Sequence, residues 1–146
     1  MGDVPENLYS IPFGKGVIRR PGADITIVAV SYMVVEALKA AEKLQAQNIS
    51  VEVIDLRTIK PIDEAIIFES LSKTGTLLIA DTGWKTGGVA SEISALVSEK
   101  AFSLLKKPII RVACPDVPTP ASDVLEQAFY PDSETICTQV IQLLKS

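Results

Sequence analysis

The chain has 146 residues, of which 47% are hydrophobic, and its formal net charge is −4. This length suits one domain, and the acidic balance argues against the basic patches through which proteins bind nucleic acid. No apolar run approaches the roughly 20 residues that a membrane-spanning helix needs, so we expect no contact with a membrane.

The residues most used in proton transfer and metal binding are scarce. The chain has no histidine and only two cysteines, Cys114 and Cys137. Histidine-containing catalytic triads and dyads are therefore excluded within this chain, and Cys114 has no histidine to activate it. Two cysteines are too few for a disulfide framework, which favours a reduced, cytoplasmic setting.

The amino-terminal third predicts a linker followed by a strand–helix–strand unit. Residues 1–12 are polar, with a proline near each end, and are interpreted as a linker, so the folded domain is expected over residues 13–146. An edge strand is expected around Val17 and Ile18, and the clearest strand over residues 24–30. Ser31 is expected to cap a helix that stops at Asn48, before a strand over residues 50–56.

A helix over residues 63–72 leads to the segment around which the chain is organised, residues 76–100. Its apolar run 77–80 is typical of a strand buried on both faces, and Asp81, Thr82 and Gly83 are expected to end it. Gly87-Gly88 permits a tight turn before a helix that begins at Val89 and stops at Lys106-Lys107-Pro108.

The remaining residues predict a strand over residues 109–113, a proline-rich loop over 114–120 and helices over 122–130 and 132–145, with Asp132 or Ser133 capping the last. Helical crossovers between strands require parallel pairing, whereas the first strand is reached through a tight turn. The predicted fold is a three-layer α/β/α sandwich of about five strands, mostly parallel, with one antiparallel edge strand.

Ligands of open α/β sheets bind beyond the carboxyl ends of the strands. A small anion could bind there at the start of the helix after Gly87-Gly88, with Ser31 and Asp81 as further contacts. The alternative is that the two glycines only allow close packing of backbone. No dinucleotide fingerprint or Walker loop is present.

Two features of these strand ends predict an interface. Asp55 and Arg57 are two residues apart and could bind a partner's loop, or form a purely structural ion pair. Trp84, the only tryptophan, is expected in a loop, where it serves either an interface or local packing.

Five stretches together resemble one family: residues 3–16, 23–30, 50–63, 85–93 and 111–120. The chain is similar to the carboxyl-terminal domain of transketolase-like enzymes. The greatest similarity is to the beta subunit of the thiamine-diphosphate-dependent decarboxylase component of 2-oxo acid dehydrogenase complexes, of the pyruvate, branched-chain or acetoin type.

The resemblance implies that the catalytic groups lie outside this chain. In such beta subunits a pyrimidine-binding domain precedes this one, and the alpha subunit holds thiamine diphosphate and magnesium. We therefore expect either an excised domain or the product of a split gene, with no catalytic, cofactor or metal residue of its own.

The implied role is assembly with the pyrimidine-binding domain, the alpha subunit, a second beta subunit and the acyltransferase core. The candidate interface residues are Asp55, Arg57, Trp84, Lys85, Thr86, Gly87, Gly88 and Glu92. Two alternatives stay open: the same domain of a transketolase or deoxyxylulose-phosphate synthase, and a stand-alone module that binds a small anion through Ser31, Gly87 and Gly88.

Overall fold

The computed structural model describes residues 7–145. Residues 1–6 of the predicted linker lie outside the described residues, and residues 7–12 form neither helix nor strand. The elements in chain order are β1 (Val17–Arg20), β2 (Ile25–Ala29), α1 (Met33–Gln45), β3 (Val51–Asp55), α2 (Glu64–Thr74), β4 (Leu77–Trp84), α3 (Val89–Lys100), the 3₁₀ turn η1 (Phe102–Leu104), β5 (Ile110–Cys114), α4 (Asp123–Phe129) and α5 (Ser133–Lys145).

The strands form one five-stranded sheet in the order β1-β3-β2-β4-β5. β2 pairs in parallel with both β3 and β4, and β4 pairs in parallel with β5. β1 pairs antiparallel with β3, with Val17 opposite Asp55. The predicted antiparallel edge strand is thereby confirmed.

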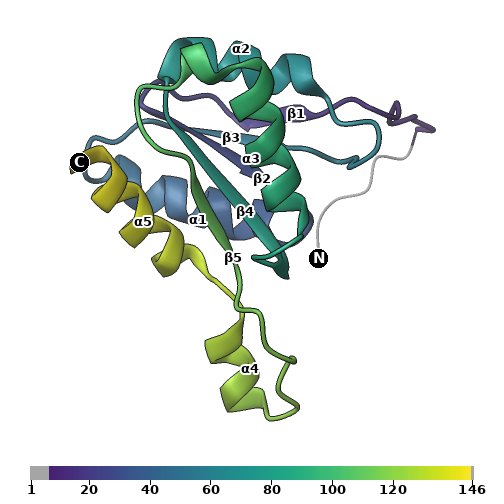
Figure 1. Cartoon of the computed structure of the whole chain (residues 1–146), viewed down its shortest axis with the longest axis vertical. Helices are drawn as coiled ribbons and strands as arrows, with labels where there is room; N and C mark the ends of the chain where they lie inside the picture. The colour runs from purple at the N-terminus through teal and green to yellow at the C-terminus, as the bar shows by residue number, and fades with distance from the viewer. Residues whose placement is uncertain (1–6, 146) are drawn as a thin grey trace.

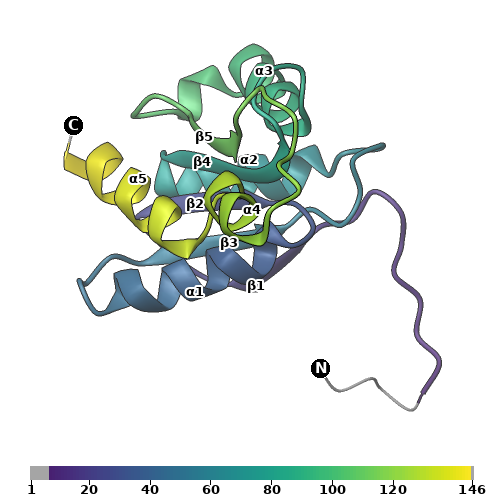
Figure 2. The same ribbon diagram turned by 90° about the horizontal axis from the view of Figure 1, so that it is seen from below.

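Helices cover both faces of the sheet, as Figures 1 and 2 show. Alternate residues of β2 point to opposite layers: Ile25, Ile27 and Ala29 pack with α1 and α5, and Val28 packs with α2 and α3. All five residues of β2 are buried, so the apolar run has no face left for solvent. The predicted three-layer sandwich is confirmed.

Three local predictions were wrong. Ser31 does not cap α1: its φ of 54° is left-handed, and the cap position is Tyr32, which makes no side-chain cap bond. β4 continues to Trp84, because after a register shift Trp84 pairs with Cys114 of β5. α3 ends at Lys100 and not near Lys106, since the chain turns at Ala101 and brings Leu104 and Leu105 onto the α2–α3 core.

Other helix ends follow the sequence signals. The Asp132 carboxylate accepts a hydrogen bond from the Thr135 amide (2.9 Å), so Asp132 caps α5 as predicted. Asn48 takes a left-handed backbone after α1, and Gly75 does the same after α2. Among the described residues, no helix combines the length and apolar character that a membrane crossing requires.

One buried carboxylate joins α1 to α5. Glu36 is only 5% exposed. Its Oε1 accepts hydrogen bonds from the Tyr32 hydroxyl (3.0 Å) and the Lys39 ammonium (2.7 Å), and its Oε2 accepts one from the Ser133 amide (2.9 Å). Burial alone would raise the pKa of Glu36, but the bonds from Lys39, Ser133 and Tyr32 outweigh it and hold the pKa below its ordinary value.

The turn between β4 and α3 depends on its two glycines in different ways. Gly87 has a φ of +69° and open space around its Cα, whereas a Cβ on Gly88 would lie 2.2 Å from the Trp84 carbonyl oxygen. Gly87 therefore supplies a left-handed backbone, and Gly88 supplies the close approach of α3 to the end of β4.

We expect Glu36→Ala to lower the free energy of unfolding by about 2–3 kcal/mol, because the buried Ser133 amide loses a charged acceptor. Glu36→Gln keeps the shape and should cost about 1 kcal/mol. Urea denaturation measures both. Lys39→Ala is the control: it removes a half-exposed partner and should cost less than about 1 kcal/mol.

The same contact predicts a pH dependence. Because the folded state lowers the pKa of Glu36, its stabilisation is present above the pKa of the unfolded chain and is lost as the pH falls through the folded pKa. The stability difference between wild type and Glu36→Gln should therefore shrink as the pH is lowered from about 7 to about 3. A difference that grew with acidity would contradict this role.

The glycine turn predicts an order of stabilities. Gly88→Ala forces backbone to move and should cost at least about 2 kcal/mol, whereas Gly87→Ala should cost only the roughly 1–2 kcal/mol of a left-handed alanine. Chemical denaturation measures the free energy of unfolding of both variants. An equal loss of stability in the two would show that the close packing at Gly88 is unimportant.

Candidate functional site

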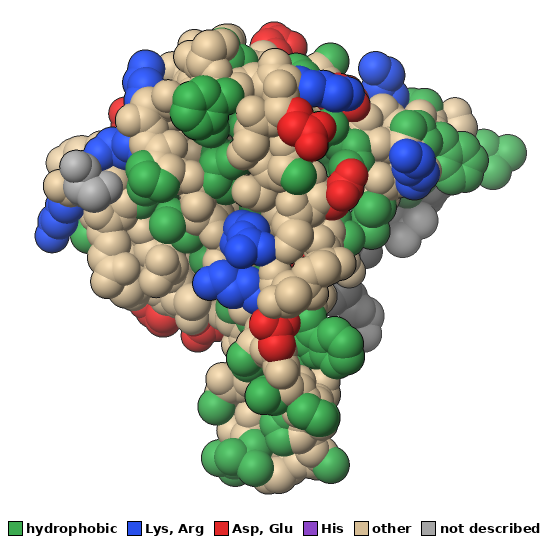
Figure 3. All heavy atoms as spheres, in the orientation of Figure 1, with side chains coloured by type: hydrophobic (Ala, Val, Ile, Leu, Met, Phe, Trp, Pro, Cys, Tyr) green, Lys and Arg blue, Asp and Glu red, His purple; other side chains and the backbone are tan. Residues whose placement is uncertain are grey.

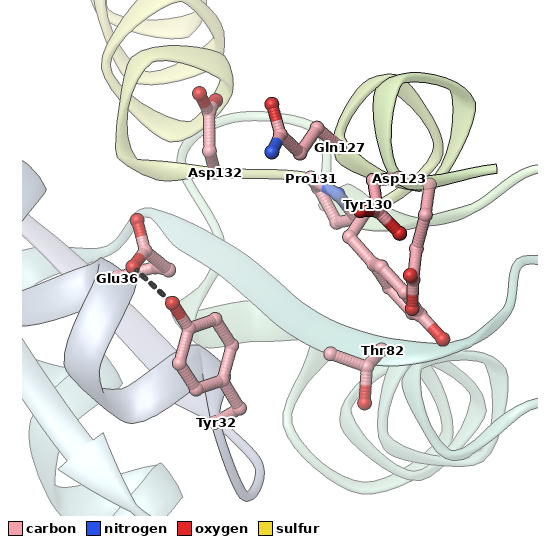
Figure 4. Close-up of a pocket in the computed structure, with 9 residues that line it drawn as sticks. Tyr32, Glu36, Thr82, Asp123, Gln127, Tyr130, Pro131 and Asp132 are labelled. Atoms are coloured by element: carbon pink, nitrogen blue, oxygen red, sulfur yellow. Dashed lines mark hydrogen bonds between the residues drawn. The ribbon is translucent and has the colours of Figure 1, made fainter.

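Two hollows open at the carboxyl ends of the parallel strands. The first has a volume of about 790 Å³ and lies between the sheet and α4. Tyr32 and Thr82 line it from the ends of β2 and β4, and Tyr130 and Asp123 face them from α4 and its end, as Figure 4 shows. These two strands are neighbours whose following helices cover opposite faces of the sheet, so this hollow lies at the switch point of the fold.

The first hollow is acidic. Its charged lining residues are Glu36, Asp123, Glu126 and Asp132, and no lysine or arginine lines it. Its surroundings therefore disfavour a phosphate or diphosphate. Because hydrogen bonds hold the pKa of Glu36 below its ordinary value, this carboxyl is ionised at neutral pH and is not a general acid there.

The second hollow, of about 730 Å³, lies beside the ends of β2 and β3 and under residues 11–13. Asp55 stands between two guanidinium groups: the Arg19 Nε lies 3.3 Å from its Oδ2, and the Arg57 Nε lies 4.0 Å from the same atom. Asp55 and Arg57, which the sequence analysis put near each other, do form an ion pair. The structure shows that Arg19 is a second partner of Asp55. No other charged residue lines this hollow, so it carries one surplus positive charge.

Residues 85–88 are fixed to the loop after β5. The Asp116 carboxylate accepts hydrogen bonds from the Thr86 amide (3.0 Å) and hydroxyl (2.7 Å), and these two bonds lower the pKa of Asp116. The Arg111 guanidinium donates to the Lys85 carbonyl (2.8 Å) and to the Ser91 hydroxyl (2.6 Å). The turn is therefore held in one shape from both sides.

Asp81 places a buried negative charge against this turn. It is 5% exposed, and its Oδ2 has no hydrogen-bond partner. Cβ atoms built on Gly83 and Gly88 would lie 2.9 and 3.6 Å from that oxygen. The carboxylate therefore sits next to the start of α3, where it is favourable to the helix dipole but unfavourable to an incoming anion.

The three residues of the predicted anion site, Ser31, Gly87 and Gly88, do not line the same one of these two hollows. Ser31 lines the second hollow, whereas Gly87 and Gly88 line neither the first nor the second hollow. The site stays a prediction, and the buried Asp81 carboxylate beside Gly88 does not favour it.

The predicted interface residues lie on the surface at this end of the sheet. Trp84 is 58% exposed, and Lys85, Thr86, Gly87 and Glu92 are exposed as well. Gly88 is half-buried under the Trp84 carbonyl. Trp84 also lines a smaller hollow with Val117 and Pro118. Their role in an interface stays a prediction.

Sequence reasoning missed Arg19, Arg111 and Asp116, each of which fixes a predicted residue. Their partners are distant in the chain, so spacing gave no signal for them. The one available hint was that Arg19 follows Val17 and Ile18, around which an edge strand was expected.

The two thiols are poor nucleophiles in this fold. Burial raises the pKa of Cys114, and the neighbouring Asp81 carboxylate raises it further. Burial likewise raises the pKa of Cys137. The Cys114 thiol donates to the Thr82 carbonyl oxygen (3.2 Å). Both cysteines are therefore protonated at neutral pH, when a thiolate would be needed for attack.

Exposed hydrophobic side chains gather at this end of the molecule. Most of the large ones lie on residues 8–13, at the strand ends, or on the projection that carries α4; two exceptions are Ile18 and Phe102. Figure 3 shows hydrophobic side chains over the α4 projection, which stands away from the body. Exposed apolar surface of this kind is typical of a region that binds another protein or a ligand.

Comparisons of the chain with known proteins agree on one family. The profile of the family described as "Transketolase, C-terminal domain" matches residues 14–136. The chain is 43% identical over 143 residues to the beta subunit of acetoin:2,6-dichlorophenolindophenol oxidoreductase from Bacillus subtilis, covering 98% of this chain and 42% of that protein. It is 45% identical over 138 residues to the pyruvate dehydrogenase E1 component subunit beta from Rickettsia felis, covering 94% and 42%.

Among solved structures, a split gene transketolase, described as an inactive beta4 tetramer, superposes with a TM-score of 0.83 at 29% identity. The match covers 97% of this chain and 47% of that one. The chain thus spans less than half the length of the relatives that it matches. Its family is nevertheless clear from the sequence profile and the fold together: the chain belongs to the transketolase carboxyl-terminal domain family.

Proposed function

We propose that the chain is an assembly domain of a thiamine-diphosphate-dependent 2-oxo acid dehydrogenase, and that it catalyses no reaction alone. The observation that carries the proposal is the gathering of exposed apolar side chains at the carboxyl end of a sheet whose two faces are already covered. The relatives with the higher identities are beta subunits of acetoin and pyruvate enzymes.

The residues at this end of the sheet do not fit the cofactor of the whole enzyme. Thiamine diphosphate carries a diphosphate that is held with a divalent cation. The switch-point hollow presents four carboxylates, and Asp81 stands against the glycine turn. Among residues 7–145, no group of three or more carboxylates and cysteines is arranged to hold a metal ion. The proposal therefore puts the cofactor and magnesium sites in the other parts of the enzyme.

The partners follow from the same proposal. They are the pyrimidine-binding domain, the alpha subunit, a second beta subunit and the acyltransferase core. A transketolase is the less favoured parent, because the match to the split gene transketolase has the lower identity. The two buried, free cysteines suit a reduced, cytoplasmic setting.

A hybrid enzyme tests the proposal. This chain replaces the matching segment of the Bacillus subtilis acetoin beta subunit, and the hybrid is assayed for acetoin-dependent reduction of 2,6-dichlorophenolindophenol together with the rest of that enzyme. We expect activity from the assembled hybrid and none from this chain alone. In calorimetry the chain alone should bind neither thiamine diphosphate nor magnesium. Decarboxylation of a 2-oxo acid by the purified chain would refute the proposal.

A surface variant sharpens the test. Trp84→Ser in the hybrid should reduce its assembly and activity at least about tenfold, because an exposed tryptophan at an interface is a typical hot spot. Phe102→Ser is the matched control: Phe102 is 71% exposed but lies at the opposite end of the sheet, before β5. It should leave assembly unchanged, and both variants should melt like the wild type when isolated.

A further inference from the structure

Two residues with a strained backbone line the second hollow. Of the residues that the structure describes, only Ser31, Asn48 and Arg57 have a positive φ without being glycine, and Ser31 and Arg57 both line this hollow. Asn48 follows the end of α1, where a left-handed residue is common. Ser31 and Arg57 instead follow the neighbouring strands β2 and β3. Strained residues cluster at sites that hold ligands, so the hollow is a candidate for such a site.

Hydrogen bonds hold Arg57 in its unusual backbone. The Thr58 amide donates to the Leu56 carbonyl oxygen (2.6 Å), so Arg57 is the central residue of a tight three-residue turn. The Arg57 amide donates to Oδ1 of Asp55 (3.2 Å). The side chain of Arg57 is 27% exposed, and its Nε lies 4.0 Å from Oδ2 of Asp55. The turn therefore places the Arg57 guanidinium group in the wall of the hollow.

Arg19 and Arg57 have one carboxylate between them. The Arg19 Nε lies 3.3 Å from Oδ2 of Asp55, and within residues 7–145 neither arginine has another ion-pair partner. One positive charge is therefore left unmatched, on a chain whose net charge is −4. Arginine offers N–H donors in a planar fork that fits the two oxygens of a carboxylate. Ser31 also lines the hollow, and its hydroxyl adds a further donor.

The rest of the wall is mostly aliphatic. It comes from the end of β2, from α1, from the segment after β3 and from residues 11–13. Its apolar members are Ile11, Pro12, Phe13, Val30, Val34, Val35, Leu56 and Ile59. A hollow of about 730 Å³ with an apolar wall and a few polar groups is typical of a site for a small organic ligand. The single unmatched charge favours a monoanion over a phosphate or a diphosphate.

We infer that the second hollow binds a small monocarboxylate with a short aliphatic tail. The carboxylate of the ligand pairs with the guanidinium groups of Arg57 and Arg19 and accepts a hydrogen bond from Ser31. Its tail packs against Val35 and Ile59. This site differs from the anion site predicted from the sequence, because it uses neither glycine of the turn before α3. The inference goes beyond the proposed assembly function and does not rest on it.

Titration of the whole chain with 4-methylpentanoate, followed by amide chemical shifts in NMR spectra, tests the inference. We expect saturable binding with a Kd of about 1 mM, which is reasonable for a ligand of this size, and shifts confined to residues around the hollow. 4-Methylpentanamide has the same tail without the charge, and acetate has the charge without the tail. Each should bind at least about tenfold more weakly, since one loses the charged hydrogen bonds and the other the apolar contact.

Two variants change the hollow without touching the core. Arg57→Gln removes the unmatched positive charge, and Val35→Glu places a negative charge in the apolar wall. Each should weaken the binding of 4-methylpentanoate at least about tenfold. Val35 is 46% exposed on α1, so its variant should fold normally even if Arg57→Gln disturbs the strained turn. Circular dichroism of both variants checks this.

Two matched controls make the same changes elsewhere. Arg20→Gln alters the neighbour of Arg19 in β1, and Val124→Glu alters a valine that is 75% exposed on α4; neither residue lines the hollow. Both controls should bind the acid like the wild type. An equal loss in the controls, equal binding of acid and amide, or shifts spread over the surface would show adventitious attraction only and would overturn the inference.

A peptide distinguishes a free acid from the end of a partner's chain, which carries the same carboxylate. A short peptide that ends in leucine should bind more weakly than 4-methylpentanoate, because its backbone amides would have to enter an apolar wall. Tighter binding of the peptide, or no binding of the acid at about tenfold the expected Kd, would overturn the inference. Neither result bears on the hybrid enzyme, so failure here leaves the assembly function standing.

Discussion

The burial of both faces of the sheet is the constraint on which the rest of the structure depends. The side chains of β2 pack alternately into the α1–α5 layer and the α2–α3 layer. A parallel sheet closed in this way can present new chemistry only at its ends, where the backbone leaves the sheet. The turns after β2, β3, β4 and β5 therefore carry nearly all the features that distinguish this surface.

Hydrogen bonds and ion pairs give that end of the sheet a fixed pattern of charge. Glu36 is held ionised by three donors and contributes to an acidic hollow. Asp55 instead lies between two arginines and leaves the neighbouring groove positive. Asp116 and Arg111 fix the turn at residues 85–88 from either side. A rigid edge with charges of both signs is suited to binding other protein surfaces in one orientation.

The same edge offers neither a histidine nor a reactive thiol. The two thiols are buried and have raised pKa values, and the chain has no histidine. The division of labour that we propose follows: this domain supplies shape and contacts, and other parts of the enzyme supply the cofactor and proton transfer. The relatives, more than twice as long as this chain, have room for those parts.

The sequence by itself predicted the three layers and a mostly parallel sheet with one antiparallel edge strand, because apolar runs, helical periodicity and turn residues act over short distances. The family was predicted separately, from the resemblance of five stretches of the chain to known motifs. The sequence misplaced the cap at Ser31 and the ends of β4 and α3, where long-range packing overrides local preference: Trp84 joins β5, and Leu104 leaves the helix for the core. The sequence pointed to Asp55 and Arg57 as interface residues but not to Arg19, which forms an ion pair with Asp55. It pointed to Thr86 but not to Asp116, whose carboxylate accepts hydrogen bonds from Thr86. Only the tertiary structure decided how charge is divided between the two hollows, because that division depends on side chains that are far apart in the chain and meet only in the folded protein.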